Sequence, residues 1–272
     1  MTDTTGSSTG SPTGSPSPLL VTGGTGTLGS LVVPLLREAG VPVRVLSRTA
    51  RPAADGVTPV RGDLLKDEGL DAALDGVETV LHLAGGPKGD DVAARNLVRA
   101  ARAARVRHLV LVSVIGADTV PLAWFKAKLE AERAVSGSGL PWTTLRAAQF
   151  HELALTVAEK LAKLPVVPVP GGVRWQPVDS REVAARLVEL ALGRPAGLVA
   201  DLAGPTVHTL GDLSRDYLRA RGKRRLMLPV RMPGKAGRAY RAGENLSLDG
   251  AMTGERTWEA FLAERMAERL AP

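Results

Sequence analysis

From Pro18 onward the chain alternates short apolar runs with longer stretches of helical periodicity. The apolar runs are Leu19–Thr22, Val43–Ser47, Val57–Arg61, Val80–Leu83, Leu109–Ser113 and Thr143–Arg146. The helical stretches between them are Leu28–Ala39, Leu70–Leu74, Val92–Ala104 and Leu122–Val135. This alternation is typical of βαβ units around a parallel sheet. We therefore predict an α/β fold of the Rossmann type, a doubly wound parallel sheet of six strands spanning residues 18–150.

Pro34 lies inside the first predicted helix. A proline there removes one backbone hydrogen bond, which destabilises a helix by about 3 kcal/mol. We expect a kinked but continuous helix at this position.

After Phe150 the pattern becomes less regular. It predicts helices at Glu152–Lys163, Arg181–Leu192 and Trp258–Leu270, a strand around Val166–Val169, and a helix that begins at the capping box Thr209-x-x-Asp212 and ends near Arg219. We expect residues 151–272 to form a small, partly irregular C-terminal lid over the carboxyl edge of the sheet.

The first 17 residues are nearly all Ser, Thr, Gly and Pro. Such a segment cannot bury enough apolar surface to offset its ordering entropy, so we predict a disordered tail over residues 1–17. The chain has no run of the ~18 apolar residues that a membrane span needs, and no pattern like a signal peptide's. We expect a soluble, cytoplasmic protein without a membrane partner.

The amino-acid composition argues against several kinds of functional site. Aromatic residues are only 3% of the chain, which argues against base-stacking platforms for single-stranded nucleic acid. The absence of cysteine excludes disulfides, thiolate metal sites and a cysteine nucleophile. The four histidines are scattered without i, i+4 spacing, so we predict no metal site.

The formal net charge is +7, and the densest basic stretch, Arg219–Arg241, contains no acidic residue. This charge fits either an acidic partner such as nucleic acid or a solvated surface. Because Pro229 and Pro233 interrupt the helix that a DNA-groove reader needs, we favour the solvated surface and do not expect nucleic-acid binding.

A glycine-rich turn follows the first predicted strand and opens the first predicted helix. Its sequence is Thr22-Gly23-Gly24-Thr25-Gly26-Thr27-Leu28-Gly29. In this pattern Gly23 permits a tight turn, Gly26 lets the backbone approach a pyrophosphate, and Gly29 allows the helix to pack closely on the strand. We predict that Gly23, Thr25, Gly26, Thr27, Leu28 and Gly29 bind a dinucleotide, with the N–H groups of Thr27 and Leu28 facing the anion. No Gly-Lys-Ser/Thr follows, which excludes an ATP-type phosphate loop.

The end of the second predicted strand indicates which dinucleotide binds. Folds that prefer NAD place an acidic residue there, on the ribose 2′-hydroxyl, whereas this strand ends in Ser47-Arg48. A guanidinium can hold a 2′-phosphate through paired donors. We therefore predict NADP(H) as the favoured cofactor, with Ser47 and Arg48 in its site. A solvated loop arginine is the alternative.

The chain from Pro18 to about Pro205 resembles the atypical short-chain dehydrogenase/reductases, in particular the NmrA-like NAD(P)-binding group. The resemblance rests on the glycine turn and on Arg61-Gly62-Asp63-Leu64, His82-Leu83-Ala84-Gly85, Val112-Ser113 and the stretch Val178–Ala184. It implies that Asp63 and Leu64 border the adenine, that Ala84 and Gly85 lie along the ribose and pyrophosphate, and that Leu145–Ala148 passes near the nicotinamide. An ordinary turn aspartate remains the alternative for Asp63.

Catalytic members of this group carry Tyr-x-x-x-Lys, in which the tyrosine passes a proton to the substrate. Here Trp124 occupies the tyrosine position, and an indole N–H is not an acid near neutral pH. Lys128 remains and could hold the nicotinamide ribose, and Ser113 lies near the position of the assisting serine. His151 follows the last predicted strand and is our candidate replacement acid, with a pocket or surface histidine as the alternative.

Two functional hypotheses follow. The first is an NADPH-dependent reductase of a small, quinone-like substrate that needs little acid catalysis from the protein. The second is a sensor that binds NADP(H) without turnover and signals to a protein partner. Loss of the tyrosine argues against a conventional alcohol or ketone dehydrogenase.

Overall fold

The structure, a computed structural model, describes residues 17–49, 52–53, 55–86 and 88–269. The tail predicted over residues 1–17 lies outside the described residues except for Ser17.

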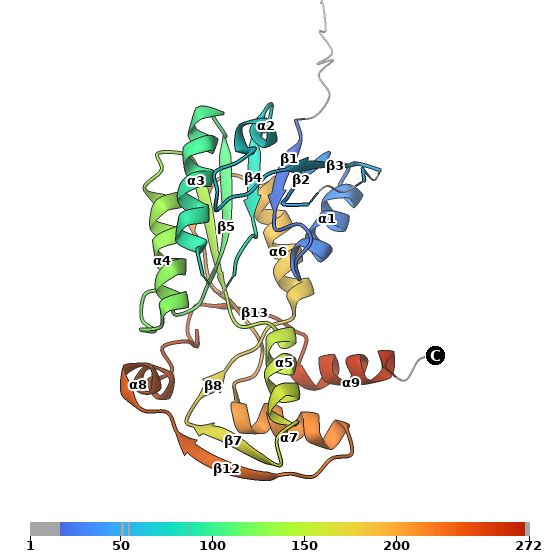
Figure 1. Ribbon diagram of the computed structural model, residues 1–272, viewed down its shortest axis with the longest axis vertical. Helices are drawn as coiled ribbons and strands as arrows, with labels where there is room; N and C mark the ends of the chain where they lie inside the picture. The colour runs from blue at the N-terminus through green and yellow to red at the C-terminus, as the bar shows by residue number, and fades with distance from the viewer. Residues whose placement is uncertain (1–16, 50–51, 54, 87, 270–272) are drawn as a thin grey trace, which may run out of the picture.

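A parallel sheet forms the centre of the molecule (Figure 1). Its strands are β1 (Leu19–Thr22), β2 (Val43–Ser47), β3 (Val57–Arg61), β4 (Thr79–His82), β5 (His108–Val114), β6 (Trp142–Ala147), β9 (Gly197–Leu198), β10 (Leu202–Ala203) and β13 (Met252–Thr253). The order across the sheet is β13-β10-β6-β5-β4-β1-β2-β3, and β9 also pairs with β6. The six strands predicted from the pattern are confirmed to within one residue at each end, and so is the Rossmann-type architecture.

The strand order reverses between β1 and β4. From β1 the chain moves outward through β2 to β3, and then returns to the other side of β1 with β4, β5 and β6. In parallel sheets of this kind the ligand binds beyond the carboxyl ends of the strands at such a switch point. The topology therefore places the expected ligand site over the ends of β1 and β4.

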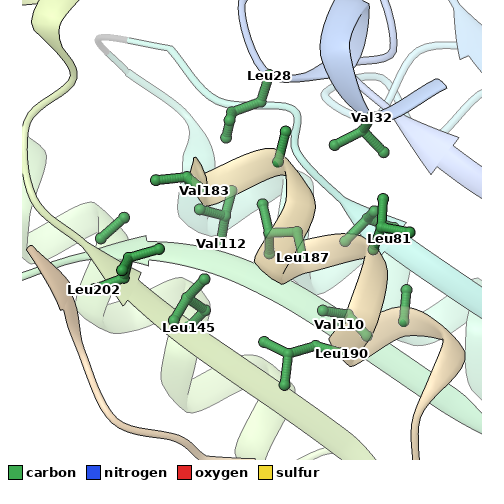
Figure 2. Packing of buried hydrophobic residues seen from close by; sticks show 14 of the residues in the cluster. Leu28, Val32, Leu81, Val110, Val112, Leu145, Val183, Leu187, Leu190 and Leu202 are labelled. Atoms are coloured by element: carbon green, nitrogen blue, oxygen red, sulfur yellow. The ribbon is translucent and has the colours of Figure 1, made fainter. Parts of the chain in front are cut away.

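Helices cover both faces of the sheet. On one face lie α1 (Gly29–Glu38) and α6 (Ser180–Leu192), and on the other lie α2 (Leu70–Leu74), α3 (Asp90–Ala103) and α4 (Ala123–Ser136). Figure 2 shows Leu187 of α6 among Leu81, Val110 and Leu145 of the strands, all buried. The helix α6 and the short strands β9, β10 and β13 all follow residue 150, so the chain returns to the sheet after the six predicted strands.

The predicted helix around Pro34 is continuous. The proline lies inside α1, and the helix runs on to Glu38. Buried Val32 and Leu36, on either side of the proline, pack into the same cluster as α6. Packing of this face against the sheet accounts for a helix that tolerates the missing hydrogen bond.

The remaining elements form a second group beyond the carboxyl edge of the sheet (Figure 1). They are α5 (His151–Leu161), β7 (Val166–Gly171), β8 (Arg174–Trp175), β11 (His208–Thr209), α7 (Leu210–Ala220), β12 (Leu226–Arg231), α8 (Gly234–Ala242) and α9 (Trp258–Glu268). β7 pairs with β12 in parallel, and β8 pairs with β11 antiparallel. Their own apolar cluster is centred on Trp258, Phe261, Leu213 and Tyr217.

The basic stretch Arg219–Arg241 contains two elements that the sequence does not predict, β12 and α8. The sequence pattern does not indicate them, because prolines and glycines normally interrupt strands and helices. Pro229 lies within β12, and α8 begins at Gly234 directly after Pro233. Helix α8 is short, and its buried Ala239 and Tyr240 face the rest of the molecule. Tertiary packing therefore stabilises a helix of weak intrinsic propensity.

The stretch Val178–Ala184 joins the C-terminal elements to the sheet. Asp179 caps α6 by accepting a hydrogen bond from the Arg181 N–H at 2.8 Å, and it pairs with the guanidinium groups of Arg181 and Arg256. Both arginines also pair with Glu264 of α9 at 2.8 Å. Burial opposes ionisation of Asp179, but the bonds from Arg181 and Arg256 lower its pKa to about 2. Asp179 is therefore an anion that holds α9 against the start of α6.

Within the described part of the chain, no helix is both long enough and apolar enough to cross a lipid bilayer.

Candidate functional site

Two adjoining cavities lie at the switch point. The larger, of about 610 Å³, extends over the ends of β1, β2 and β3, and the smaller, of about 350 Å³, extends over β5 and β6 toward α4 and α5. Both are lined by Gly23, Gly26, Leu83, Gly85 and Gly86. A long ligand can therefore lie across the glycine turn with one end in each cavity.

The three glycines of the turn to which the sequence assigns a role have different surroundings. Gly23 has φ +70°, and a Cβ there would lie 2.6 Å from the backbone nitrogen of Ala84. At Gly29 a Cβ would lie 2.2 Å from the carbonyl oxygen of Gly23, so α1 packs directly on the turn. At Gly26 the nearest atom would be the Gly23 oxygen at 3.4 Å, so this position borders open space. A side chain at Gly26 would occupy the cavity rather than the protein interior.

The start of α1 offers hydrogen-bond donors to this space. The turn is closed by the Gly26 N–H, which donates to the Gly23 oxygen at 3.0 Å. Among the residues that the structure describes, the backbone N–H groups of Thr27 and Leu28 donate to no protein acceptor. Such donors at a helix N-terminus, where the helix dipole is positive, suit the oxygens of a phosphate.

The larger cavity brings together residues predicted to bind the adenine, the ribose and the phosphates of a dinucleotide. Thr25, Ser47, Arg48, Asp63, Leu64, Ala84 and Gly85 all line it. Arg48 is exposed and has no ion pair among the described residues, so its guanidinium is free to meet an anion. Asp63 Oδ1 accepts the N–H of Leu65 at 2.8 Å, as in the turn aspartate that is the alternative for this residue, and Asp63 also lines the cavity.

The smaller cavity is mostly apolar, with a few polar groups. Leu28, Trp124, Phe150 and Leu153 give it aromatic and aliphatic walls. Ser113 and Gln149 are buried in its lining, and neither the Ser113 Oγ nor the Gln149 Oε1 has a hydrogen-bond partner in the described part of the chain. Buried polar atoms are normally paired, so these two oxygens, each enclosed by protein, are unusual features of the lining.

The sequence reasoning missed Gln149. Its position carried a usable signal, because it follows the carboxyl end of β6 by two residues, at the edge where this fold binds ligands. Its backbone is held in place by the Val178 N–H, which donates to the Gln149 oxygen at 3.0 Å. Val178 belongs to the stretch Val178–Ala184 that carries the family resemblance, so this stretch also holds part of the wall of the smaller cavity in place.

Lys128 lines the smaller cavity and forms a buried ion pair. Its Nζ lies 2.9 Å from Asp90 Oδ2, and the side chains are 10% and 5% exposed. Asp90 Oδ1 also accepts the N–H of Gly86 at 2.8 Å. The sequence predicts Lys128 in the site but not Asp90, which begins α3 and lies 38 positions earlier in the chain.

His82 lies behind this pair. Its Nδ1 is 2.6 Å from the Oγ1 of Thr22, and the residue is fully buried. Burial, and then the positive charge of Lys128, lower the pKa of His82 to about 4. His82 is therefore neutral near pH 7, and it holds the ends of β1 and β4 together.

Trp124 lies one helical turn before Lys128 on α4, in the position of the family's tyrosine. It is half-buried, lines the smaller cavity and packs edge-on against Phe125, with ring centroids 5.1 Å apart. Tyr217 and Tyr240 are instead buried in the cluster of the C-terminal elements. Neither tyrosine lines the two cavities, so no phenol replaces the missing one among the described lining residues.

The structure does not bring His151 into either cavity. The residue begins α5, is fully buried, and packs against Trp258 and Phe261, with ring centroids 6.1 and 5.1 Å away. Neither ring nitrogen has a hydrogen-bond partner in the part of the chain described. Burial lowers the pKa of His151 to about 4. A neutral imidazole outside both cavities cannot deliver a proton there, so the prediction that His151 replaces the tyrosine as the acid is wrong.

Tertiary packing brings one of the scattered histidines, His208, close to two carboxylates. One ligand atom each of His208, Asp216 and Glu259 lie within 4.8 Å of one another. Asp216 also pairs with Arg219 at 3.3 Å, so the protein itself supplies a cation to this group.

Residues 23–191 match the model of a protein family described as NAD(P)H-binding. The match includes the glycine turn and the lining of both cavities. The chain belongs to this family. Its motifs predicted this membership, and the two cavities across the glycine turn lie where Rossmann folds bind dinucleotides.

Two relatives of this NAD(P)H-binding protein are named as reductases. It is 35% identical over 185 residues to the NAD(P)H azoreductase of Xenophilus azovorans, covering 65% of this chain and 64% of the relative. The chain thus spans slightly less than two thirds of that protein. It is 34% identical over 214 residues to the (4-alkanoyl-5-oxo-2,5-dihydrofuran-3-yl)methyl phosphate reductase of Streptomyces griseus, covering 75% and 74%.

A solved structure shares the whole architecture of this NAD(P)H-binding protein. The NADPH-dependent quinone oxidoreductase of Escherichia coli, complexed with NADPH, superposes with a TM-score of 0.76 at 24% identity. The superposition covers 93% of this chain and all of that one. At this coverage, most of the residues after residue 150 belong to the shared fold.

Proposed function

We propose that this protein is an NADPH-dependent reductase of flat, uncharged, electron-poor acceptors of the quinone or azo class. The observation that carries the proposal is the smaller cavity, which combines apolar and aromatic walls with two unpartnered buried polar atoms beside the glycine turn. The names of the relatives, an azoreductase and a quinone oxidoreductase, support the same class.

The residues present fit a nicotinamide dinucleotide. The free N–H groups of Thr27 and Leu28 and the open space at Gly26 suit its pyrophosphate. Ser113 and Gln149 are the polar residues of the smaller cavity beside the expected position of the nicotinamide, and their side-chain oxygens have no partner in the described part of the chain. When bound, the dinucleotide supplies the hydride that reduces the acceptor.

The preference for NADP(H) rests on Arg48. Its exposed guanidinium lines the larger cavity without an ion pair in the described part of the chain, and the preceding strand ends without an acid. A 2′-phosphate there would gain charge-assisted hydrogen bonds, whereas a 2′-hydroxyl would gain much less.

The charged residues that line the smaller cavity favour an uncharged acceptor. Among its described lining residues Lys128 is the only cation, and Asp90 already neutralises it. A substrate phosphate, as in the name of the Streptomyces relative, would meet no free cation in the smaller cavity. We therefore propose a neutral quinone or azo acceptor rather than a phosphate ester.

The missing tyrosine points to the same acceptors. Reduction of a ketone produces an alkoxide, a strong base that needs a proton as it forms. A hydroquinone oxygen is a much weaker base because its charge is delocalised over the ring, so water can protonate it afterwards. Trp124 then serves as an aromatic wall, and Lys128 with Asp90 positions the segment around Gly85 and Gly86.

The test is a titration with NADPH, NADP, NADH and NAD, followed by measurement of NADPH oxidation in the presence of a benzoquinone, an azo dye and a simple ketone. We expect turnover of the quinone or the azo dye and little or none of the ketone. Tight NADPH binding without turnover of any acceptor would overturn the proposal and favour the NADP(H) sensor.

A further inference from the structure

The outer face of the two-stranded ribbon β7–β12 is apolar along its whole length. In the parallel register Leu226, Leu228 and Val230 stand beside Val166, Pro168 and Pro170. Paired residues of a parallel ladder point to the same side. We call these six residues the apolar ribbon face.

The apolar ribbon face is turned outward. Leu226, Leu228, Val230 and Val166 are 69%, 54%, 43% and 38% exposed. The opposite face packs inward at Val167, which is fully buried, and at Val169 and Met227, which approach Gly211 of α7, whereas Pro229 on that face is exposed. The ribbon lies at the far end of the C-terminal group from the central sheet (Figure 1). A solvated sheet face normally alternates with polar residues, so six apolar positions in register indicate a surface that something covers.

Cations stand at both ends of strand β12. Before it come Arg221, Lys223, Arg224 and Arg225, and at its end come Arg231, Lys235 and Arg238, all of them exposed. In the described part of the chain, none of these seven side chains forms an ion pair. The surface that covers the ribbon must therefore be both apolar and anionic.

We propose that the apolar ribbon face is a peripheral membrane-binding surface that contacts bilayers containing anionic lipids. The aliphatic side chains enter the boundary between headgroups and acyl chains, while the cations at the two ends of β12 meet the lipid phosphates. The acyl chains of a bilayer can pack against an apolar face of any shape. The anionic headgroups can form ion pairs with the cations, which have no such partner in the described part of the chain.

Edge pairing with another strand does not account for this face. Each strand of the ribbon has one free edge, but Pro229 lies in the middle of β12, and Pro168 and Pro170 lie in β7. Proline has no N–H to donate, so it blocks the addition of a further strand.

A second copy of this chain fits the face less well than a bilayer. Two copies in contact through this face would bring their Arg219–Arg241 segments together, and these segments are basic and contain no acidic residue. The face is also small: six residues per strand and two strands cover on the order of 200 Å². A stable protein interface buries about 800 Å² on each partner. A bilayer does not require an interface of this size or a complementary shape. Burial of the apolar side chains and attraction of the cations to anionic lipids both contribute to the binding free energy.

The test is co-sedimentation of the full chain with vesicles of phosphatidylcholine, either pure or mixed with phosphatidylglycerol. We expect binding to the mixed vesicles only, and weaker binding at high salt. The double variant Leu226→Ser/Leu228→Ser should weaken binding at least about tenfold. Reversing Lys223, Arg224 and Arg225 to Glu should weaken it by more than about a hundredfold, because each cation near an anionic bilayer strengthens binding about fivefold.

Matched controls change the same properties elsewhere. Leu198→Ser/Leu248→Ser removes two leucines of similar exposure, and Arg102→Glu/Arg105→Glu/Arg194→Glu makes the same change in net charge. These variants should bind vesicles much as the unmodified chain does, and unchanged NADPH binding shows that each variant is folded.

Three results would overturn the proposal. The first is no binding to the mixed vesicles, or an equal loss in the ribbon variants and their controls. The second is a dimer in sedimentation velocity that Leu226→Ser/Leu228→Ser abolishes, which would assign the face to self-association. The third is double-stranded DNA binding that competes with vesicles and depends on Lys223, Arg224 and Arg225 but not on Leu226 and Leu228.

Discussion

Lys128 Nζ lies 2.9 Å from Asp90 Oδ2, in an ion pair that joins the lining of the smaller cavity, where Lys128 lies, to the lining of the larger cavity, where Asp90 lies. Asp90 Oδ1 binds the Gly86 N–H, so the pair also fixes a segment that lines both cavities. The lysine of the family motif is thus joined to the cofactor site through a carboxylate on another helix.

Removal of one partner should destabilise the fold. Lys128→Met leaves Asp90 buried without its counter-ion, which lowers the free energy of unfolding by about 3 kcal/mol or more. The double variant Lys128→Met/Asp90→Asn should recover part of that loss, because the amide oxygen still accepts from Gly86. Urea denaturation measures both effects. A single variant as stable as the unmodified chain would show that the pair is not a structural element.

Gly26→Val should block the cofactor without unfolding the protein. The new side chain projects into the open space of the turn, so NADPH affinity should fall at least tenfold, about 1.4 kcal/mol. Gly29→Val is the contrasting variant, since its Cβ would lie 2.2 Å from the Gly23 oxygen and should destabilise the fold itself. Calorimetric titration and thermal unfolding distinguish the two. Unchanged NADPH affinity in folded Gly26→Val would contradict the proposed site.

Arg48→Ala should weaken NADPH far more than NADH. Loss of a charge-assisted hydrogen bond to the 2′-phosphate removes about 1.5 to 3 kcal/mol, whereas NADH has no such group. Arg102→Ala, which removes an exposed arginine of α3, serves as the control. Dissociation constants for both cofactors measure the effect. An equal loss for NADPH and NADH would mean that Arg48 does not read the phosphate.

Trp124→Tyr should raise the rate of ketone reduction. The phenol would stand one helical turn from Lys128 and line the smaller cavity, where general acid catalysis typically contributes ~100-fold to 10,000-fold. Trp124→Phe keeps an aromatic ring without the acid, so it should leave ketone reduction slow. The readout is kcat for a ketone relative to kcat for a quinone. Fast ketone reduction by the unmodified chain would refute the acid-free mechanism.

Stability should decrease as the pH falls from about 6.5 to 4. In this range the unfolded chain protonates His82 and His151 at their ordinary pKa of 6.5, whereas in the folded protein the pKa of each is about 4. The unfolded state therefore binds more protons, and each histidine removes about 2 kcal/mol of stability at pH 5. The pKa of Asp179, about 2 in the folded protein against an ordinary 3.8, confines its own effect to pH values below about 5.

His151→Leu isolates one of the two histidines. The substitution should leave stability at pH 7.5 unchanged or higher, because the buried ring has no hydrogen-bond partner among the described residues. It should also flatten the pH dependence by about 2 kcal/mol at pH 5. Urea denaturation at the two pH values provides the measurement. Loss of reductase activity at pH 7.5 in a folded variant would restore a catalytic role to His151.

The sequence by itself determined the elements whose signals are local. Short apolar runs specified the strands, and most clearly β1, β4 and β5, because burial on both faces of a parallel sheet demands continuous apolar residues. The glycine spacing specified the turn, since a positive φ at Gly23 and a direct backbone contact at Gly29 leave no room for another residue. Trp124 and Lys128 could be placed together because four positions on a helix return to the same face.

Only the tertiary structure decided the features that join distant segments. Asp90 meets Lys128, Gln149 lines the smaller cavity, and His151 packs away from it, although all three follow or begin regular elements. β12 pairs with β7 some 60 positions earlier, and α6 returns to the sheet after the chain has left it. No local pattern encodes these outcomes, because they depend on which buried surfaces and charges find partners when the whole chain packs.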